Sequence, residues 1–323
     1  MESLLEVSNL HTSFYTDAGE VKAVCGVSFR LCSGQTFGLV GESGCGKSVT
    51  ALSIMRLLQY PAVIKEGSIV YKGKSLLELP DTAMRDIRGK EIAMVFQEPM
   101  TALNPVFKIG DQIVEAIRLH QGLSKRDALK KAVESLKLVG IALPETRVSE
   151  YPHQLSGGMR QRAMIAMALS CEPNLLIADE PTTALDVTIQ AQILALIKDL
   201  QKKFSMAMIL ITHDLGVVAE VVDWVAVMYA GKIVEYTDTA RLFEGPLHPY
   251  TIGLLDSVPR LGERRGRDKK GLKTIPGFVP RYMDYLIGCS FRERCPKADD
   301  SCSASEPELT EVEKGHLVAC FKV

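Results

Sequence analysis

A glycine-rich segment near the start of the chain has the residue types that bind phosphate groups. It runs from Gly41 to Ser48 with the spacing Gly-x4-Gly-Lys-Ser, and a strand-like apolar stretch at residues 37–40 precedes it. Glycines let the backbone curl so that its N–H groups face phosphate oxygens, and the following helix adds the positive end of its dipole. Lys47 is placed to reach the terminal phosphates and Ser48 to bind Mg²⁺. The segment therefore predicts a nucleotide site.

Two carboxylates later in the chain support this interpretation. Residues 175–178 are apolar, and Asp179 and Glu180 follow them directly. Carboxylates at the C-terminal end of a parallel strand project towards the same crevice as a phosphate loop. Asp179 is suited to hold the Mg²⁺ shell, and Glu180 is suited to polarise the attacking water as a general base. The two segments together predict hydrolysis of a bound nucleoside triphosphate.

A second glycine-containing segment predicts another anion site. Ser156, Gly157 and Gly158 follow Leu155 and open a helix that runs towards Ser170. Backbone N–H groups at a helix N-terminus bind anions. One chain does not need two such sites for one γ-phosphate. The arrangement makes sense if this segment completes the site of a partner chain.

In type and order these segments are similar to the motifs of ABC transporter ATPases. The resemblance covers residues 4–235 and implies an α/β P-loop NTPase fold with a helical subdomain at about residues 100–160. In that family the serine–glycine signature acts across a head-to-tail dimer, and an aromatic residue stacks on adenine. The nucleotide-binding residues that the resemblance implies are Phe14 or its neighbour Tyr15, Gly41, Ser43, Gly44, Cys45, Gly46, Lys47, Ser48, Val49, Gln97, Ser156, Gly157, Gly158, Asp179 and Asp186.

Three further roles follow from the same resemblance. Gln97 matches the glutamine that senses Mg²⁺ and water and links to the membrane subunit. Asp186, in the segment 184–186, matches the loop that contacts the opposite monomer. His213 matches the histidine that holds the γ-phosphate. The implied catalytic residues are Glu180, His213 and Gln97, and the implied Mg²⁺ ligands are Ser48, Gln97 and Asp179.

One position within the motifs departs from the family pattern, and another carries a thiol. Met159 stands where the family commonly has glutamine, and we expect no effect because the serine and both glycines before it remain. Cys45 lies inside the phosphate loop. Its thiol could be activated by Lys47 and the helix dipole, so that alkylation would block ATP binding. The alternative, which we favour, is that Cys45 is a small residue tolerated there.

The elements that must position these motifs follow from hydrophobic periodicity. Strand patterns before and after a purely helical region between residues 101 and 156 indicate an α/β core with a helical insertion. Ser124 is expected to cap one insertion helix. The expected strands are residues 5–7, 23–31, 36–40, 67–71, 92–96, 175–178, 208–212 and 224–229, and the expected helices are 47–58, 109–120, 125–139 and 188–203.

Length and composition set outer limits on the function. A chain of 323 residues predicts about two domains, and we expect them at residues 1–235 and 236–323. The composition is 46% hydrophobic and 24% charged with a net charge of -1, which gives no general attraction to nucleic acid. The N-terminus lacks the pattern of a secretory signal, and no apolar run reaches the roughly 18 residues of a membrane span. The resemblance to ABC transporter ATPases implies a peripheral protein at the cytoplasmic face of the inner or plasma membrane.

Three segments resemble one subfamily of these ATPases. Residues 96–105, 247–259 and 288–320 are similar to segments of dipeptide and oligopeptide importer ATPases. That resemblance implies two integral-membrane permease subunits, a second ABC ATPase that is a copy or a related chain, and indirect contact with a solute-binding protein. Importers of nickel or metal chelates share this architecture and remain the alternative.

Four cysteines lie in the last 35 residues, at Cys289, Cys295, Cys302 and Cys320. Disulfides are not expected in a reducing compartment. Four thiolates can hold zinc or a 4Fe–4S cluster, and the spacing alone does not choose between them. The subfamily resemblance favours 4Fe–4S, with Zn²⁺ and four free thiols as alternatives. His316 is a possible substitute for one cysteine ligand.

Two other classes of protein compete with a transporter subunit. Non-transport ABC ATPases carry long coiled-coil insertions or two cassettes, whereas here about 107 residues separate Ser48 from Ser156 and one cassette is present. A redox sensor that merely binds ATP would require a tail cluster whose oxidation changes the ATPase rate. Co-purification with membrane proteins would favour the transporter over both.

Overall fold

A computed structural model describes residues 3–183, 185–258, 274–280 and 287–323. The chain divides into two compact units, the first formed by residues 1–4, 31–36 and 71–211 and the second by residues 5–30, 37–70 and 212–323. Both units contain strands and helices, as expected for the α/β class. No helix within the described ranges is long and apolar enough to cross a membrane.

The first unit contains three parallel strands and most of the helices. Its strands pair in the order β8-β7-β6, with Ile92 opposite Leu175 and Leu175 opposite Ala207. The side chains of β6 and β7 are buried throughout, as is usual for parallel strands covered on both faces. The elements are β5 (Lys74–Ser75), α2 (Asp81–Ile87), β6 (Ile92–Val95), α3 (Pro99–Ala102), α4 (Ile109–Gln121), α5 (Lys125–Leu138), α6 (Pro144–Arg147), a 3-10 turn (Pro152–Gln154), α7 (Gly157–Leu169), β7 (Leu175–Asp179), α8 (Val187–Phe204) and β8 (Ala207–Thr212).

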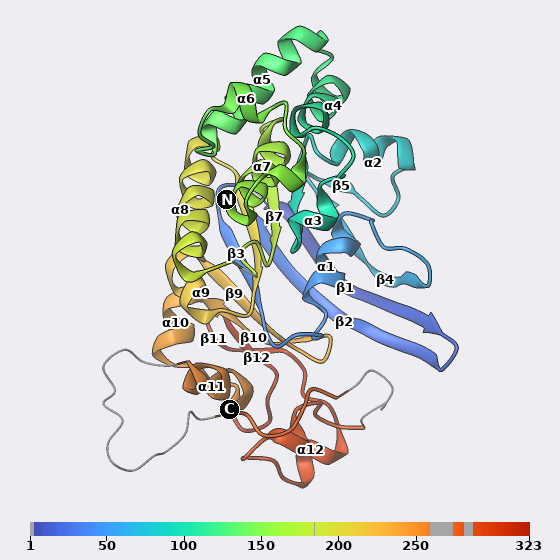
Figure 1. The fold of residues 1–323 in the computed structure, drawn as a ribbon. Coiled ribbons are helices and arrows are strands. Elements are labelled where there is room, and N and C mark those ends of the chain that lie inside the picture. The colour runs from blue at the N-terminus through green and yellow to red at the C-terminus, as the bar shows by residue number, and fades with distance from the viewer. Residues whose placement is uncertain (1–2, 184, 259–273, 281–286) are drawn as a thin grey trace, which may run out of the picture. The chain divides into compact units, whose positions relative to one another are not determined.

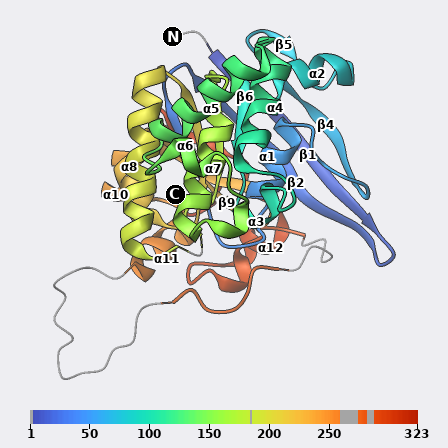
Figure 2. The same ribbon diagram turned by 45° about the horizontal axis from the view of Figure 1, so that its top comes forward.

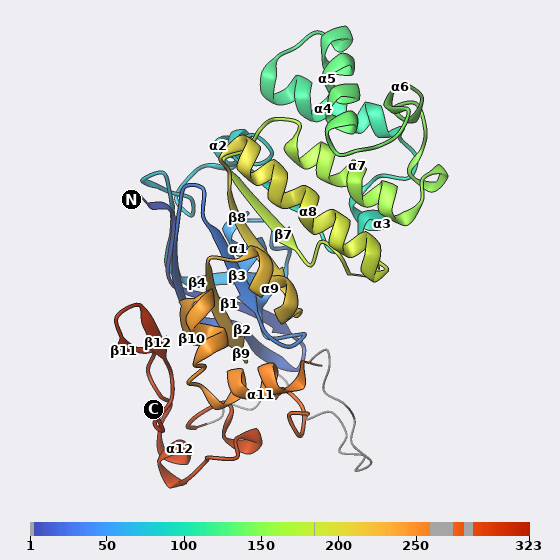
Figure 3. The same cartoon turned by 90° about the vertical axis from the view of Figure 1, so that its left-hand side faces the viewer.

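The helical insertion forms as expected. Figure 3 shows α4, α5 and α6 grouped with α7 at one end of this unit. The amphipathic pattern of α4 buries Ile113 and Ile117, which lie four residues apart on one face. Ser124 caps α5, because its Oγ accepts the N–H of Asp127 at 3.2 Å. The local sequence of the insertion is sufficient to define these helices.

The second unit contains two sheets. One has the strand order β2-β1-β4, and Figure 2 shows its three long strands running side by side. The other has the order β11-β12-β10-β9-β3, in which β3 is parallel to β9. The elements are β1 (Ser3–Thr16), β2 (Gly19–Cys32), β3 (Thr36–Val40), α1 (Lys47–Ile54), β4 (Ala62–Tyr71), α9 (Leu215–Val221), β9 (Trp224–Tyr229), β10 (Lys232–Asp238), α10 (Thr239–Glu244), α11 (Pro249–Ser257), a 3-10 turn (Arg292–Arg294), α12 (Asp300–Ala304), β11 (Thr310–Glu313) and β12 (His316–Val318).

Four elements of this unit differ in length from their predicted counterparts. β1 and β2 each span 14 residues, because the short segments expected at 5–7 and 23–31 continue into one long hairpin. α1 ends at Ile54 rather than near residue 58, since Arg56 adopts a positive φ of 49° that a helix cannot continue through. β4 begins at Ala62, before the predicted segment 67–71. The other predicted strands and helices lie within a few residues of their expected bounds, whereas elements such as α2, α9 and β10 were not predicted.

The end of the chain is built into the sheet of the second unit. β12 pairs antiparallel with β10, with Glu235 opposite Val318, and the two strands lie side by side in Figure 1. The Glu235 carboxylate is fully buried and accepts the N–H groups of Leu247 and His248 at 2.8 and 3.0 Å. It also contacts His316 Nε2 at 2.8 Å. A domain boundary at residue 235 therefore stays a prediction.

Candidate functional site

The predicted phosphate loop connects β3 to α1 and has a backbone that requires glycine. Gly41 has φ 150°, and a Cβ there would lie 2.3 Å from the carbonyl oxygen of Met228. Gly46 has φ 103°, and a Cβ there would lie 2.4 Å from the carbonyl oxygen of Ala23. Both distances are far below any real carbon–oxygen contact. The two glycines of the motif are therefore required by the close approach of neighbouring strands.

Lys47 lies within this loop rather than extending away from it. Its side chain is 5% exposed, and its Nζ donates to the carbonyl oxygens of Gly41 at 2.8 Å and Glu42 at 2.9 Å. Lys47 is also the first residue of α1, followed by Ser48 and Val49. An ammonium group at the N-terminus of a helix, beside a loop rich in backbone N–H groups, is suited to bind phosphate oxygens.

Cys45 does not have the character of a reactive thiol. It is 1% exposed, and burial raises its pKa, although the nearby Lys47 acts in the opposite direction. Its thiolate is therefore scarce at neutral pH, and reagents have little access to it. Burial supports the interpretation of Cys45 as a small residue packed in the loop and does not favour the activated-thiol alternative.

Three other predicted nucleotide contacts lie in the second unit. Phe14 and Tyr15 are neighbours on β1 and so face opposite sides of the sheet. Tyr15 is 42% exposed with Lys65 Nζ at 4.9 Å from its ring centroid, whereas Phe14 is half-buried. His213 is exposed directly after β8, and Asp214 beside it caps α9 by accepting the N–H of Gly216 at 2.8 Å. Adenine stacking on one of these aromatic residues stays a prediction.

In the first unit the predicted acidic pair lies together with the predicted glutamine. Asp179 ends β7 and is 6% exposed. Glu180 follows in the left-handed region with φ 44°, a conformation that costs energy for a non-glycine residue. Its Oε2 accepts Gln97 Nε2 at 3.0 Å and Thr183 Oγ1 at 2.8 Å. These donors fix one carboxylate oxygen, as expected of a group that must be oriented towards a water molecule.

Sequence reasoning did not include Thr183 in this group. Thr183 lies three residues after Glu180. Its hydroxyl donates to the Glu180 carboxylate, and its backbone N–H donates to the Glu180 carbonyl oxygen at 3.1 Å. A threonine two residues beyond the proline that follows a strand end is a turn signal. That signal could have identified Thr183 as the residue that closes the turn around the carboxylate.

The signature segment also lies in the first unit, at the start of α7. Ser156 is the N-cap, with its Oγ accepting the N–H of Met159 at 3.3 Å, and it is exposed together with Gly157. A Cβ on Gly158 would lie 3.1 Å from Ile189, so this glycine lets α7 approach α8 closely. Asp186 caps α8 by accepting the N–H of Ile189 at 3.0 Å. Ala184 of the same predicted loop lies outside the described residues.

The four tail cysteines do not form the predicted metal site. Within the described ranges no group of three or more His, Cys, Asp and Glu side chains is placed to hold a metal ion. Burial raises the pKa values of Cys289 and Cys295, and the charges of the other tail thiolates add to that shift. Cys302 Sγ instead contacts Asp299 Oδ1 at 3.7 Å, and Cys320 Sγ accepts the N–H of Lys322 at 3.4 Å. The 4Fe–4S and zinc expectations are not supported by this arrangement.

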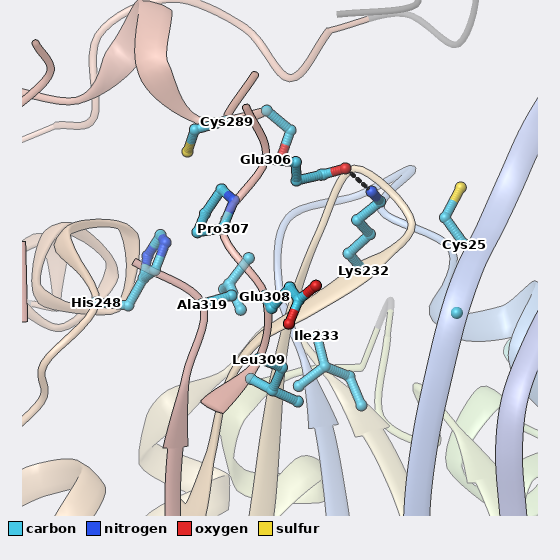
Figure 4. A pocket seen from close by; sticks show the side chains of 13 residues that line it. Cys25, Lys232, Ile233, His248, Cys289, Glu306, Pro307, Glu308, Leu309 and Ala319 are labelled. Atoms are coloured by element: carbon cyan, nitrogen blue, oxygen red, sulfur yellow. Dashed lines mark hydrogen bonds and ion pairs between the residues drawn. The ribbon is translucent and has the colours of Figure 1, made fainter. Parts of the chain in front are cut away.

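His316 likewise belongs to no metal-holding group within the described residues. It is 2% exposed, and its Nε2 contacts the buried Glu235 carboxylate. Cys289, one of the four predicted tail ligands, lines a pocket of about 370 Å³ (Figure 4). His248, Cys25 and the Lys232–Glu306 ion pair line the same pocket. Because the contact with Glu235 involves Nε2 alone, the possible role of His316 as a metal ligand stays a prediction without support in the described residues.

The similarity to known proteins covers the whole chain and not only these motifs. The ABC transporter family model matches residues 24–183, and the model of the oligopeptide/dipeptide transporter C-terminal region matches residues 234–302. A probable peptide ABC transporter ATP-binding protein of Sinorhizobium fredii is 55% identical, over 99% of this chain and 95% of its own length. The chain belongs to the peptide ABC transporter ATP-binding proteins.

Further relatives of this ABC ATPase agree with that assignment. The dipeptide transport ATP-binding protein DppD of Bacillus subtilis is 54% identical over 99% of this chain and 95% of its own length. Among solved structures, an ATP-binding cassette in a dimeric post-hydrolysis state with ADP and phosphate has a TM-score of 0.65 at 26% identity. That similarity covers 73% of this chain and 98% of the other. The P-loop NTPase fold of ABC cassettes, expected from the sequence, is confirmed.

Proposed function

We propose that this ABC ATPase binds and hydrolyses ATP to drive the import of dipeptides or oligopeptides. The observation that carries the proposal is similarity along the full chain. Relatives whose names specify peptide transport are 52–55% identical over 99% of its length. The C-terminal region model adds support from a part of the chain that contains none of the ATP motifs.

In the proposed reaction each predicted site residue has one task towards Mg²⁺–ATP. The loop N–H groups and Lys47 bind the phosphates, and Ser48 and Asp179 hold Mg²⁺. Glu180 takes a proton from the attacking water, and Gln97 orients that water. The Gln97 and Thr183 contacts with the Glu180 carboxylate support this role because they fix the direction of its oxygens.

We further propose that two ATP-binding chains enclose two nucleotides head to tail. The exposed Ser156 and the N-terminus of α7 would then contact the γ-phosphate held by the partner chain. His213 would contact the γ-phosphate in its own chain. A solved ATP-binding cassette similar to this chain is dimeric, which supports the proposal. The second chain is either another copy or a related subunit.

The proposed partners and location follow from family membership. ATP-driven association of the two ATPases would move two permease subunits between inward-facing and outward-facing states. A solute-binding protein would contact those permeases rather than this chain. The chain would therefore work at the cytoplasmic face of the plasma membrane as a peripheral subunit.

Uptake of labelled solutes in cells tests the proposed function and its nickel alternative together. We expect cells that lack this chain to lose uptake of its labelled dipeptide or oligopeptide substrate by at least about tenfold, since closure requires ATP binding. Restoring the wild-type chain should restore uptake, whereas a Lys47→Ala chain should not. Uptake of labelled nickel should be unchanged. Loss of nickel uptake with normal peptide uptake would instead identify a metal importer.

We also propose that the four tail cysteines bind a metal, with 4Fe–4S favoured over zinc. Four thiols form a suitable donor set for either metal. Burial raises the pKa values of Cys289 and Cys295, and the charges of the other tail thiolates contribute to that shift. Binding would require the thiols to lose their protons and to turn from their present contacts towards a common centre.

Analysis of anaerobically purified protein decides between the metal alternatives. We expect a brown protein with about four iron and four acid-labile sulfide per chain, and a loss of both in a Cys295→Ser variant. Cys171→Ser is the matched control, because Cys171 lies outside the tail and should retain full iron content. A colourless protein with stoichiometric zinc would support the zinc site. A protein without either metal would contradict the proposal and leave four free thiols.

A further inference from the structure

The tail of the chain contacts the second residue of the phosphate loop directly. Arg294 Nη1 donates to Glu42 Oε2 at 2.7 Å, and Arg294 Nη2 donates to Glu42 Oε1 at 3.0 Å. This is a bidentate pair in which the fork of the guanidinium matches both carboxylate oxygens. The Glu42 backbone N–H donates to Tyr250 Oη at 2.9 Å. Tyr250 and Arg294, which follow Glu42 by 208 and 252 positions, thus hold a residue inside the loop.

Lys47 completes the set of contacts around Glu42. Its Nζ donates to the Glu42 carbonyl oxygen at 2.9 Å as well as to that of Gly41. The N–H, the C=O and both carboxylate oxygens of Glu42 therefore all have partners. Because Glu42 immediately precedes the loop residues 43–46, these contacts define where the next backbone N–H groups point.

Arg294 is itself held rigidly. It is 7% exposed, and its Nε donates to the carbonyl oxygen of Pro276 at 2.8 Å. The guanidinium lies 5.7 Å from the ring centroid of Tyr229 and 6.0 Å from that of Phe291. Cation–π contacts of this kind suit arginine better than lysine. The hydrogen bond with Glu42 raises the pKa of Arg294 further, so its positive charge is permanent.

Tyr250 is fixed by the same aromatic group. It is fully buried, with its ring centroid 4.7 Å from that of Tyr229 and 5.4 Å from that of Phe291. Burial raises its pKa, which keeps the hydroxyl protonated and able to accept the Glu42 N–H through its oxygen. The tail therefore presents two preorganised groups to Glu42 rather than two mobile ones.

The tail also borders the open side of the loop. Residues 277–280 and residues 42–44 line one pocket of about 860 Å³. The Pro276 carbonyl that anchors Arg294 lies immediately before this segment. Arg294, which lies in the cysteine-bearing region, therefore contacts both Pro276 and the loop that carries the proposed phosphate contacts.

We propose that Arg294 is a positioning residue that holds the phosphate loop, through Glu42, in the conformation that binds ATP. The tail then contributes to ATP affinity without touching the nucleotide. This inference rests on the proposed assignment of the loop and Lys47 to ATP. A purely structural role, in which the pair only fastens the tail, would change the melting temperature and leave ATP affinity unaltered.

Calorimetric titration of the full-length chain with Mg²⁺–ATP tests the proposal. We expect Arg294→Ala to raise the Kd for ATP by about tenfold and the KM similarly, with kcat at saturating ATP within about twofold of wild type. Arg294→Lys keeps the charge but not the bidentate fork, so its Kd should be intermediate. Arg292→Ala removes the same charge from the same 3-10 turn and should leave the Kd unchanged.

A double-mutant cycle separates positioning from simple loss of folding. Glu42→Ala should weaken ATP binding about as much as Arg294→Ala, and the double variant should be no weaker than either single one, because both remove one interaction. Additive effects would overturn the proposal, as would an Arg294→Ala or Arg294→Lys Kd within twofold of wild type. Lys47→Ala is the check on the site itself. If the Lys47→Ala chain binds ATP with the wild-type Kd, the assignment of the loop to ATP is wrong. If Lys47→Ala loses ATP binding while Arg294→Ala keeps the wild-type Kd, only the role of Arg294 is refuted.

Discussion

Replacing Glu180 by glutamine should stop ATP turnover while leaving ATP binding intact. Glutamine has nearly the same shape, and its carbonyl oxygen can still accept the hydrogen bonds from Gln97 and Thr183 that Glu180 Oε2 accepts at 3.0 and 2.8 Å. It cannot take a proton from the attacking water at neutral pH. Loss of a general base costs about 10²- to 10⁴-fold in rate, so we expect a fall in kcat of at least about a hundredfold.

The measurement compares steady-state phosphate release with equilibrium ATP binding in the same preparation. Glu134→Gln provides a matched control, because Glu134 is an exposed glutamate of α5 in the same unit. It should hydrolyse ATP at the wild-type rate. A Glu180→Gln variant that turns over within about threefold of wild type would refute the assignment of Glu180 as the base, since the effect expected of one is far larger.

Replacing Ser156 by arginine should abolish hydrolysis by a different route. Ser156 is exposed at the N-terminus of α7, so a large side chain can be accommodated there without disturbing the core of its own unit. It would instead occupy the space that a partner's γ-phosphate requires. Removing preorganised donors to such a charge costs about 10²- to 10³-fold in rate, and we expect a loss of at least that size.

ATP binding by the Ser156→Arg chain should remain close to wild type, because its own phosphate loop is unchanged. Ser156→Ala removes the helix cap but adds no bulk, so it separates loss of the cap from obstruction of the partner's site. Loss of a serine cap costs about 1 kcal/mol of stability. Ser149→Arg introduces the same side chain at another exposed serine of this unit and should remain active. An active Ser156→Arg chain would remove the signature from the mechanism.

The features that the sequence predicts well are determined by nearby residues. Ser124 and Ser156 cap their helices with side chains that reach a backbone N–H three residues later. The three glycines of the phosphate loop have positive φ values, which their residue type allows and most others exclude. Because these interactions are local, the residue types and their spacing are sufficient to predict them.

The features that the sequence does not predict are polar contacts between distant segments. Glu235 and His316 lie 81 positions apart, and Glu42 and Arg294 lie 252 positions apart. An isolated glutamate or arginine carries no periodic signal, and its partner depends on how the strands are ordered. His316 was therefore interpreted as a possible ligand, although its position on β12 opposite β10 pairs it with a buried carboxylate.

The cysteine tail shows a different limit of sequence reasoning. Spacing and thiol chemistry allow several metal sites, but they do not determine the direction in which each side chain points. In the structure Cys302 and Cys320 contact Asp299 and the backbone of Lys322, respectively. The same segment nevertheless places Arg294 against the phosphate loop. Its role in positioning Glu42 depends on that contact and not on which metal, if any, the cysteines bind.

Native mass spectrometry tests most directly whether the phosphate loop is half of a shared site. The sample is the Glu180→Gln chain, together with any ATP-binding subunit that co-purifies with it. This method counts chains and nucleotides in one experiment. With Mg²⁺–ATP we predict a complex of two ATP-binding chains and two ATP molecules. The complex should separate into single chains when Ser156→Arg is added to the same sequence. A single chain that holds one ATP at saturation, unaffected by Ser156→Arg, would contradict the account.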